Sequence, residues 1–178
     1  MPGVRRIIAG VSGSPRNLPA LRCAADLARA FHADLFPVHA WVPPALALAG
    51  RQFPSDYLYQ VWEEAAWQRL RGALDAAFGG LPPGVCSQPA VRLGKPGPIL
   101  AGAASGADDV LVIGAGRRRA GSHAWHGAVS RYCLAHASCP VLAIPPPALE
   151  LAARQRLAAR ALRRKDPDLG GKVSGGTG

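Results

Sequence analysis

The chain has 178 residues, of which 49% are hydrophobic and 6% aromatic, and its formal net charge is +10. This length predicts one domain whose core is large enough to need no disulfide bonds. The longest apolar run, residues 40–50, is about half of a membrane span and contains two prolines, which argues against a membrane protein. Residues 1–14 lack the apolar stretch and cleavage pattern of a signal peptide, so we expect a cytoplasmic protein without a membrane partner.

Strand and helix patterns alternate in the first half of the chain. Residues 4–11 predict a strand, which the Ser12–Pro15 turn ends, and residues 34–41 predict a second strand. A connection with prolines follows at residues 42–54. Two helices are expected because apolar residues recur every three or four positions. The positions are Leu18, Leu21, Ala25 and Ala28 for the first helix, and Leu58, Trp62, Ala66, Leu70 and Leu74 for the second.

The second half continues this alternation. We expect a third strand at residues 86–93, a short helix after Gly94-Lys95-Pro96, and a fourth strand at residues 110–113. The fourth strand is a short, continuous apolar run, as is typical of strands buried on both faces. A loop rich in glycine and arginine leads to a short helix opened by Gly127, and residues 141–144 form the last strand. The pattern predicts a parallel sheet between layers of helices.

The character of the chain changes after residue 146. A run of three prolines, residues 145–147, stiffens the exit from the domain. Residues 151–165 have good helix propensity, and the last residues have the composition of a disordered tail. The expected division is therefore a domain at residues 1–146 and a basic tail at residues 147–178, helical in part and then disordered.

Metal-binding residue types occur near the end of the domain. His123-x2-His126 and Cys133-x2-His136-x2-Cys139 contain the imidazoles and thiols that zinc prefers. However, Cys139 belongs to the turn before the last strand rather than to a shared helix face, so we predict no zinc site. The four cysteines lack the spacing of a disulfide scaffold, and we expect reduced, largely buried thiols.

The segment from residue 110 to residue 130 is a potential phosphate cradle. Gly114 and Gly116 allow the backbone to turn sharply after the fourth strand. The helix that Gly127 opens presents unpaired N–H groups and the positive end of its dipole, both of which favour an anion. Strand, glycine loop and helix start therefore have the order that phosphate binding requires.

This segment resembles the universal stress protein family, whose nucleotide-binding signature is G-x2-G-x9-G-(S/T), usually followed by V and S or T. Outside it, the family's order of short motifs recurs at residues 10–14, 38–41, 94–96 and 136–142. The resemblance covers about residues 4–145. Four residues match the signature and the positions after it: Gly114, Gly127, Val129 and Ser130.

Two positions depart from the signature. The second glycine is replaced by Arg117, with Gly116 one place earlier, and the final Ser/Thr is Ala128. A guanidinium binds phosphate well, so Arg117 would replace close backbone approach with charge. In ATP-binding members an aspartate after the first strand contacts the nucleoside, and this chain has Ser12 there. The ligand-contacting residues implied by the resemblance are Ser12, Ala40, Gly114, Gly116, Arg117, Gly127, Val129 and Ser130.

The resemblance also implies the fold and the activity. The expected fold is α/β, Rossmann-like (adenine nucleotide alpha hydrolase-like), with a five-stranded parallel sheet of order 3-2-1-4-5 and helices on both faces. The ligand would be ATP or a related nucleotide at the carboxyl ends of strands one and four, with no metal other than nucleotide-associated Mg. A regulatory stress-adaptation module that contacts other proteins is expected, rather than an enzyme. It would be a homodimer through the last strand: Val141, Leu142, Ala143 and Ile144.

Three alternatives remain open. Gly114 and Gly127 would shape this loop even in a family member that binds no nucleotide. The net charge of +10 also suits a basic phosphate- or nucleic-acid-binding protein of the same fold without a specific ATP site. Nucleic acid is the less favoured partner, because the basic segment at residues 154–165 has no interleaved aromatic residues to stack on bases. A weak ATPase is the third hypothesis.

Overall fold

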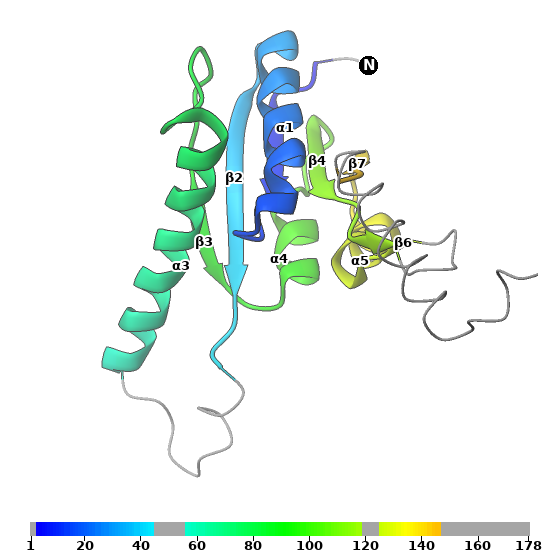
Figure 1. Cartoon of the computed structure of the whole chain (residues 1–178). Coiled ribbons are helices and arrows are strands. Elements are labelled where there is room, and N and C mark those ends of the chain that lie inside the picture. Colours follow the sequence, from blue (N-terminus) through cyan, green and yellow to red (C-terminus); the bar gives the residue numbers. More distant parts are fainter. Residues whose placement is uncertain (1–2, 45–55, 119–124, 147–178) are drawn as a thin grey trace, which may run out of the picture.

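A computed structural model of the chain describes residues 3–44, 56–118 and 125–146. Its centre is a five-stranded parallel sheet of order β3-β2-β1-β4-β7 (Figure 1). The predicted order 3-2-1-4-5 is therefore confirmed. The expected tail at residues 147–178 lies outside the described residues. The strands are β1 (Arg6–Gly10), β2 (Asp34–Trp41), β3 (Ala90–Leu93), β4 (Asp109–Gly114) and β7 (Val141–Ile144).

Helices cover both faces of this sheet, as expected. On one face, α1 (Leu18–Phe31) and α3 (Asp56–Phe78) pack on β1, β2 and β4. On the other face lie α4 (Pro96–Ala103) and α5 (Ala128–His136), which also contact each other. Within the described residues, no helix is long and apolar enough to cross a membrane.

Side-chain alternation along the strands explains this two-sided core. In β1, Ile7 packs with the core of α1 and α3, whereas Ile8 packs with that of α4 and α5. Both side chains are almost completely buried. Leu111 and Val112 repeat the arrangement in β4. Burying apolar side chains on both faces is the main stabilising contribution in such a sheet.

Several expected boundaries differ from the observed ones. The third strand begins at Ala90 rather than residue 86. The odd-numbered residues of β2 are those that bond to β3, and among them Pro37 has no N–H to donate to the carbonyl of Gln88, so the ladder is interrupted there. Ahead of β3, Ser87 makes only an isolated bridge to Leu35 of β2.

The four cysteines differ in burial. Cys86, which lies ahead of β3, is exposed, and of the four free cysteines only Cys133 is fully buried. Cys23 and Cys139 are partly buried, so the expectation of largely buried thiols fails for Cys86.

The glycine loop contains an antiparallel pair that was not expected. The two-residue strands β5 (Arg117–Arg118) and β6 (Trp125–His126) pair with each other, so that Arg117 lies opposite His126. Segments of two residues show no detectable alternation, which explains why the sequence predicted only a loop here.

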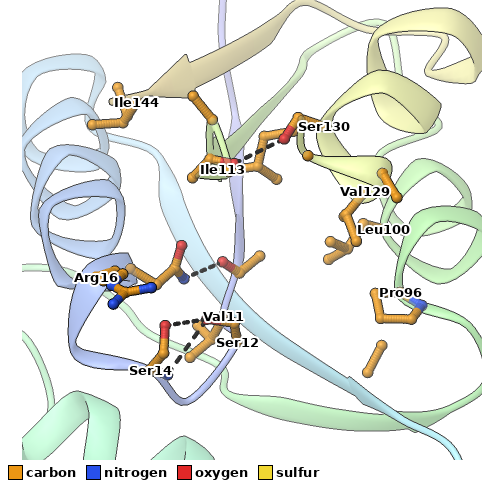
Figure 2. Close-up of a pocket in the computed structure, with 18 of the residues that line it drawn as sticks. Val11, Ser12, Ser14, Arg16, Pro96, Leu100, Ile113, Val129, Ser130 and Ile144 are labelled. Carbon is orange, nitrogen blue, oxygen red and sulfur yellow. Dashed lines mark hydrogen bonds between the residues drawn. The ribbon is translucent and has the colours of Figure 1, made fainter. Parts of the chain in front are cut away.

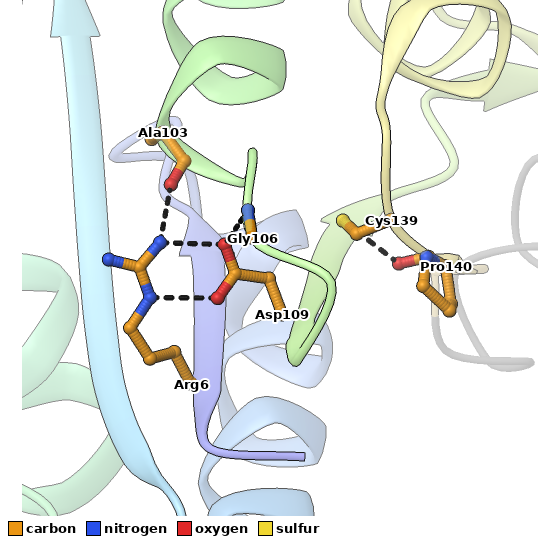
Figure 3. A network of polar contacts seen from close by, with 6 residues as sticks. All are labelled: Arg6, Ala103, Gly106, Asp109, Cys139 and Pro140. Atoms are coloured by element: carbon orange, nitrogen blue, oxygen red, sulfur yellow. Dashed lines mark hydrogen bonds and ion pairs between the residues drawn. The ribbon is translucent and has the colours of Figure 1, made fainter. Parts of the chain in front are cut away.

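An ion pair joins the amino ends of β1 and β4 (Figure 3). Arg6 donates from Nε to Asp109 Oδ1 at 2.7 Å and from Nη2 to Asp109 Oδ2 at 2.6 Å. The N–H of Gly106 donates to the same carboxylate at 2.7 Å, and Arg6 also reaches the carbonyl of Ala103. The hydrogen bonds from Arg6 lower the pKa of Asp109, although burial of the carboxyl acts in the opposite direction. Asp109 is thus held ionised although its side chain is only 3% exposed.

Candidate functional site

A cavity of about 440 Å³ opens at the carboxyl ends of β1, β2 and β4 (Figure 2). Within the sheet, β2 lies on one side of β1 and β4 lies on the other, so the order of the strands reverses at β1. This is the topological switch point of the sheet. Open parallel sheets bind their ligands at such points. Seven of the eight predicted contact residues line the cavity: Ser12, Ala40, Gly114, Gly116, Gly127, Val129 and Ser130.

The eighth predicted residue, Arg117, begins β5 immediately after this lining. Its side chain lies outside the part of the chain that the structure describes, so its contact with phosphate stays a prediction. A different arginine, Arg16, does line the cavity. It belongs to the 3₁₀ turn η1 (Pro15–Asn17) and lies across the cavity from Val129 and Pro96 (Figure 2). Its place in the cavity wall was not predicted, because an arginine in a turn is usually solvated.

The glycine loop after β4 depends on two glycines for different reasons. A Cβ on Gly114 would come within 2.7 Å of Asn17 Oδ1, so a side chain here would displace that amide. Gly116 has a φ of 82°, in the left-handed region that favours glycine. Gly116 therefore performs the sharp turn, one place before the position where the family signature has its second glycine.

Gly127 opens α5 at the cavity. A Cβ at this position would overlap Ser130 Oγ and lie 3.0 Å from the carbonyl oxygen of Ala115. No described side chain caps the helix, because the N-cap residue is this glycine. The first N–H groups of an α-helix have no partner within the helix. Since residues 127–130 all line the cavity, these donors and the positive end of the helix dipole are available to an anion there.

The hydroxyl of Ser130 fixes the loop to the helix. Ser130 Oγ donates to the carbonyl of Gly114 at 3.0 Å, and the residue is 6% exposed. With this proton engaged, the hydroxyl has only lone pairs left, which do not bind phosphate. The backbone N–H of Ser130 remains the atom by which this residue would contact an anion.

Ser12 lies at the exposed end of β1. Its hydroxyl lies 3.0 Å from Ser14 Oγ and accepts a long bond of 3.4 Å from the N–H of Ser14. These bonds are typical of a serine that stabilises its own turn. The position that carries an aspartate in ATP-binding relatives therefore contributes an uncharged hydroxyl with a local partner.

Two buried polar residues near β1 were not predicted to have a role. Asn17 donates from Nδ2 to the carbonyl of Gly10 at 2.6 Å, and His39 Nδ1 lies 2.7 Å from the carbonyl of Val11. A carbonyl only accepts, so Nδ1 of His39 carries its proton, and the buried Nε2 has no partner among the described residues. Both side chains hold the carboxyl end of β1, a function that depends on burial and leaves no local sequence signal.

Much of the cavity wall is apolar. Figure 2 shows the apolar side chains that surround it, which are Val11, Leu100, Ile113, Val129 and Ile144. Such a wall suits a flat apolar group, whereas the start of α5 and Arg16 suit an anion. The described residues contain no cluster of three His, Cys, Asp or Glu that could hold a metal ion. The cavity can therefore accept a ligand that combines a planar ring with negative charge.

Solved structures of known proteins resemble this one. A universal stress protein family member from Burkholderia pseudomallei is 22% identical with a TM-score of 0.55, covering 82% of this chain and 98% of that chain. The universal stress protein UspA from Lactobacillus plantarum is 18% identical with a TM-score of 0.53, covering 79% and 97%. A universal stress protein solved in complex with cAMP is 22% identical with a TM-score of 0.50, covering 82% and 99%.

The sequence comparisons agree with this likeness of fold. No curated protein sequence matches the chain. The sequence model of the universal stress protein family, however, matches residues 3–145, which include every described strand and helix of the domain. The order of the sheet, the helix layers and this match lead to one conclusion: the chain belongs to the universal stress protein family.

Proposed function

We propose that this protein binds an adenine nucleotide such as ATP in the cavity, and that it acts as a regulatory stress-adaptation module rather than as an enzyme. The observation that carries the proposal is the start of α5. Its N–H groups have no side-chain cap, and the first turn lines a cavity at the switch point of the sheet. An anion placed there would gain hydrogen bonds and a favourable dipole without displacing a side-chain cap among the described residues.

The remaining walls support a nucleotide rather than phosphate alone. Val38 and Ala40 at the end of β2, together with Leu100, give an apolar region in which a base could be buried. Arg16 adds positive charge to the same cavity. The family member solved with cAMP gives further support, since its ligand is an adenine nucleotide. The only metal we expect is Mg that is bound to the phosphates of the nucleotide, as we expected from the sequence.

The apolar walls also distinguish this proposal from a general binder of polyanions. Nucleic acid held through its phosphates would not need an apolar cavity, and its binding would weaken steeply with added salt. ATP bound in the cavity should retain most of its affinity when salt is added, because only a few charged groups of the protein would contact its phosphates. Titrations of ATP and of an unlabelled polynucleotide at low and moderate salt compare the two functions directly.

The nucleotide content of the gently purified protein tests the proposal first. After denaturation, mass spectrometry of the supernatant should detect an adenine nucleotide near one equivalent, or calorimetry should detect binding of added ATP to the empty protein. If the protein carries none and also fails to bind ATP, ADP and AMP, the proposal is wrong. Function would then lie outside this cavity.

Replacing Ala128 with glutamate should weaken ATP binding at least about tenfold without destabilising the fold. Ala128 is the first residue of α5, and its exposed side chain lines the cavity. A carboxylate there would repel phosphate, yet acidic residues in the first turn are favourable for a helix. The uncharged Ala128→Gln is the matched control and should bind ATP within about twofold of the unaltered protein. Equal affinities of the two variants would show that no phosphate lies at the start of α5.

We further propose that the protein is a homodimer through β7. This strand is the edge of the sheet next to β4, and an unpaired edge offers its N–H and C=O groups to another strand. Leu142 in β7 is 39% exposed and Leu134 of α5 is 59% exposed, so apolar side chains are found beside this edge. A second copy of the chain would cover both.

Replacing Leu142 with lysine should shift the protein from dimer to monomer. A charge on the edge strand opposes strand pairing, and it would place two like charges close together in a symmetric interface. Leu81→Lys is the control, since Leu81 is 61% exposed in the turn after α3, away from β7. Sedimentation velocity of both variants measures the change. A monomeric unaltered protein, or a Leu142→Lys variant that stays dimeric, would contradict the proposed interface.

A further inference from the structure

The side chain of Asn17 presents at the cavity an acceptor that has no partner among the described residues. Asn17 is 8% exposed and lines the cavity, and its Nδ2 donates to the carbonyl of Gly10. That bond uses one of the two N–H donors of the amide, and no described group donates to Oδ1. Oδ1 lies against Gly114, which lines the cavity together with Asn17. The oxygen therefore belongs to the cavity wall.

The chemistry of this oxygen restricts what it can bind. An amide oxygen only accepts hydrogen bonds. An ionised phosphate has no proton to give, so Asn17 Oδ1 is unsuited to that part of a nucleotide. A sugar hydroxyl or an amino group on the base can donate to it. Once a ligand fills the cavity and excludes water, an acceptor left without a donor costs free energy, so a ligand that supplies the donor binds more tightly than one that does not.

The position of Asn17 favours the sugar over the base. Oδ1 lies against Gly114, at the end of β4, and Nδ2 is bonded to Gly10, at the end of the adjacent β1. The start of α5, where we propose that phosphate binds, lies beside Gly114, because Ser130 Oγ donates to the carbonyl of Gly114. The apolar region proposed for the base lies at the end of β2, on the other side of β1. The sugar joins base and phosphate and must therefore pass the ends of β1 and β4.

We propose that Asn17 Oδ1 accepts a hydrogen bond from a ribose hydroxyl, which makes Asn17 a specificity-determining residue for ribonucleotides. This inference rests on the proposed nucleotide function of the same cavity. Ser12 is less suited to recognise the sugar, because its exposed hydroxyl already forms a hydrogen bond with Ser14. The residue that recognises the sugar thus lies in η1 and not at the end of the first strand.

The test compares ATP, 2′-deoxy-ATP and 3′-deoxy-ATP by calorimetry on the unaltered full chain. One of the two deoxy compounds should bind about 3- to 30-fold more weakly than ATP, the expected effect of one hydrogen bond to a buried acceptor. Equal affinities for all three nucleotides would overturn the inference while the proposed function stands. If none of the three binds, the proposed function fails and the inference fails with it.

Variants assign the preference to one side chain. In Asn17→Ala, and in the milder Asn17→Ser, the ratio of the ATP and deoxy-ATP affinities should fall to about one, whatever happens to the absolute affinities. Ser12→Ala is the matched control and should keep the ratio of the unaltered protein. The assignment is wrong if both Asn17 variants keep the preference, or if Ser12→Ala removes it. Thermal unfolding without ligand checks that each variant is folded.

Discussion

Replacing Arg6 with methionine is expected to lower the free energy of unfolding by about 2–4 kcal/mol. The change leaves the Asp109 carboxylate, 3% exposed, with the N–H of Gly106 as its remaining described donor. A buried charge that loses its partner is strongly destabilising, although the 42% exposure of Arg6 lets water reduce the loss. Urea denaturation at neutral pH measures the difference.

The exposed pair of Arg29 and Asp26 is the control for this prediction. These side chains are 37% and 74% exposed, so Asp26→Asn should cost less than about 1 kcal/mol. The pH dependence gives a second check. The pKa of Asp109 is lowered in the folded protein, so its contribution is present above about pH 4 and is lost as the pH falls. The difference in the free energy of unfolding between Arg6→Met and the unaltered protein should therefore become smaller in acid. A difference that grows as the pH falls would refute the explanation.

Replacing Gly127 with alanine is expected to lower the free energy of unfolding by about 1–3 kcal/mol and ATP affinity by about tenfold or more. The added Cβ would overlap Ser130 Oγ and press on the backbone at Ala115 and Gly116. Since backbone atoms cannot swing away as a flexible side chain does, the loop must move. That movement would break the Ser130–Gly114 bond and displace the first turn of α5 from the cavity.

Gly72→Ala is the matched control. Gly72 lies within α3 on an exposed surface, and a Cβ there would meet no atom within 4 Å. Alanine in place of glycine in a helix should raise stability by about 0.5–1 kcal/mol and leave ATP binding unchanged. Urea denaturation and calorimetry on both variants measure these effects. If Gly127→Ala were as harmless as Gly72→Ala, the close packing described for the loop would be refuted.

The layered fold was predictable because its signals are local and repeated. Apolar runs such as residues 110–113 mark strands buried on both faces, and the apolar residues of α1 recur at helical spacing. The start of β3 was missed because the ladder is interrupted at Pro37 of the neighbouring strand β2, and a scan of residues 86–93 alone does not consider the partner strand. The β5–β6 pair was missed because two-residue strands are too short to show a pattern.

The glycines of the candidate site were predictable because glycine itself is the signal. Gly114, Gly116 and Gly127 stand at turns and close approaches, and the structure brings all three to one cavity. Asn17 was missed because an asparagine shortly after Pro15 has the local pattern of a turn residue. Its importance arises from burial between the ends of β1 and β4, segments that are about a hundred residues apart in sequence.

The ion pair of Arg6 and Asp109 has a consequence for how this protein can evolve. It holds together the amino ends of β1 and β4, whereas the cavity lies at the opposite ends of the same strands. Selection for stability can therefore act at the amino ends of the strands without touching the cavity, whereas a residue such as Gly127 contributes both to the packing of the loop and to the cavity wall. Ser12 and Ala128 line the cavity and lie away from the Arg6–Asp109 pair, so we expect that they can be replaced without weakening the link that keeps the strands paired. The lining of the cavity could in this way vary while the same sheet persists.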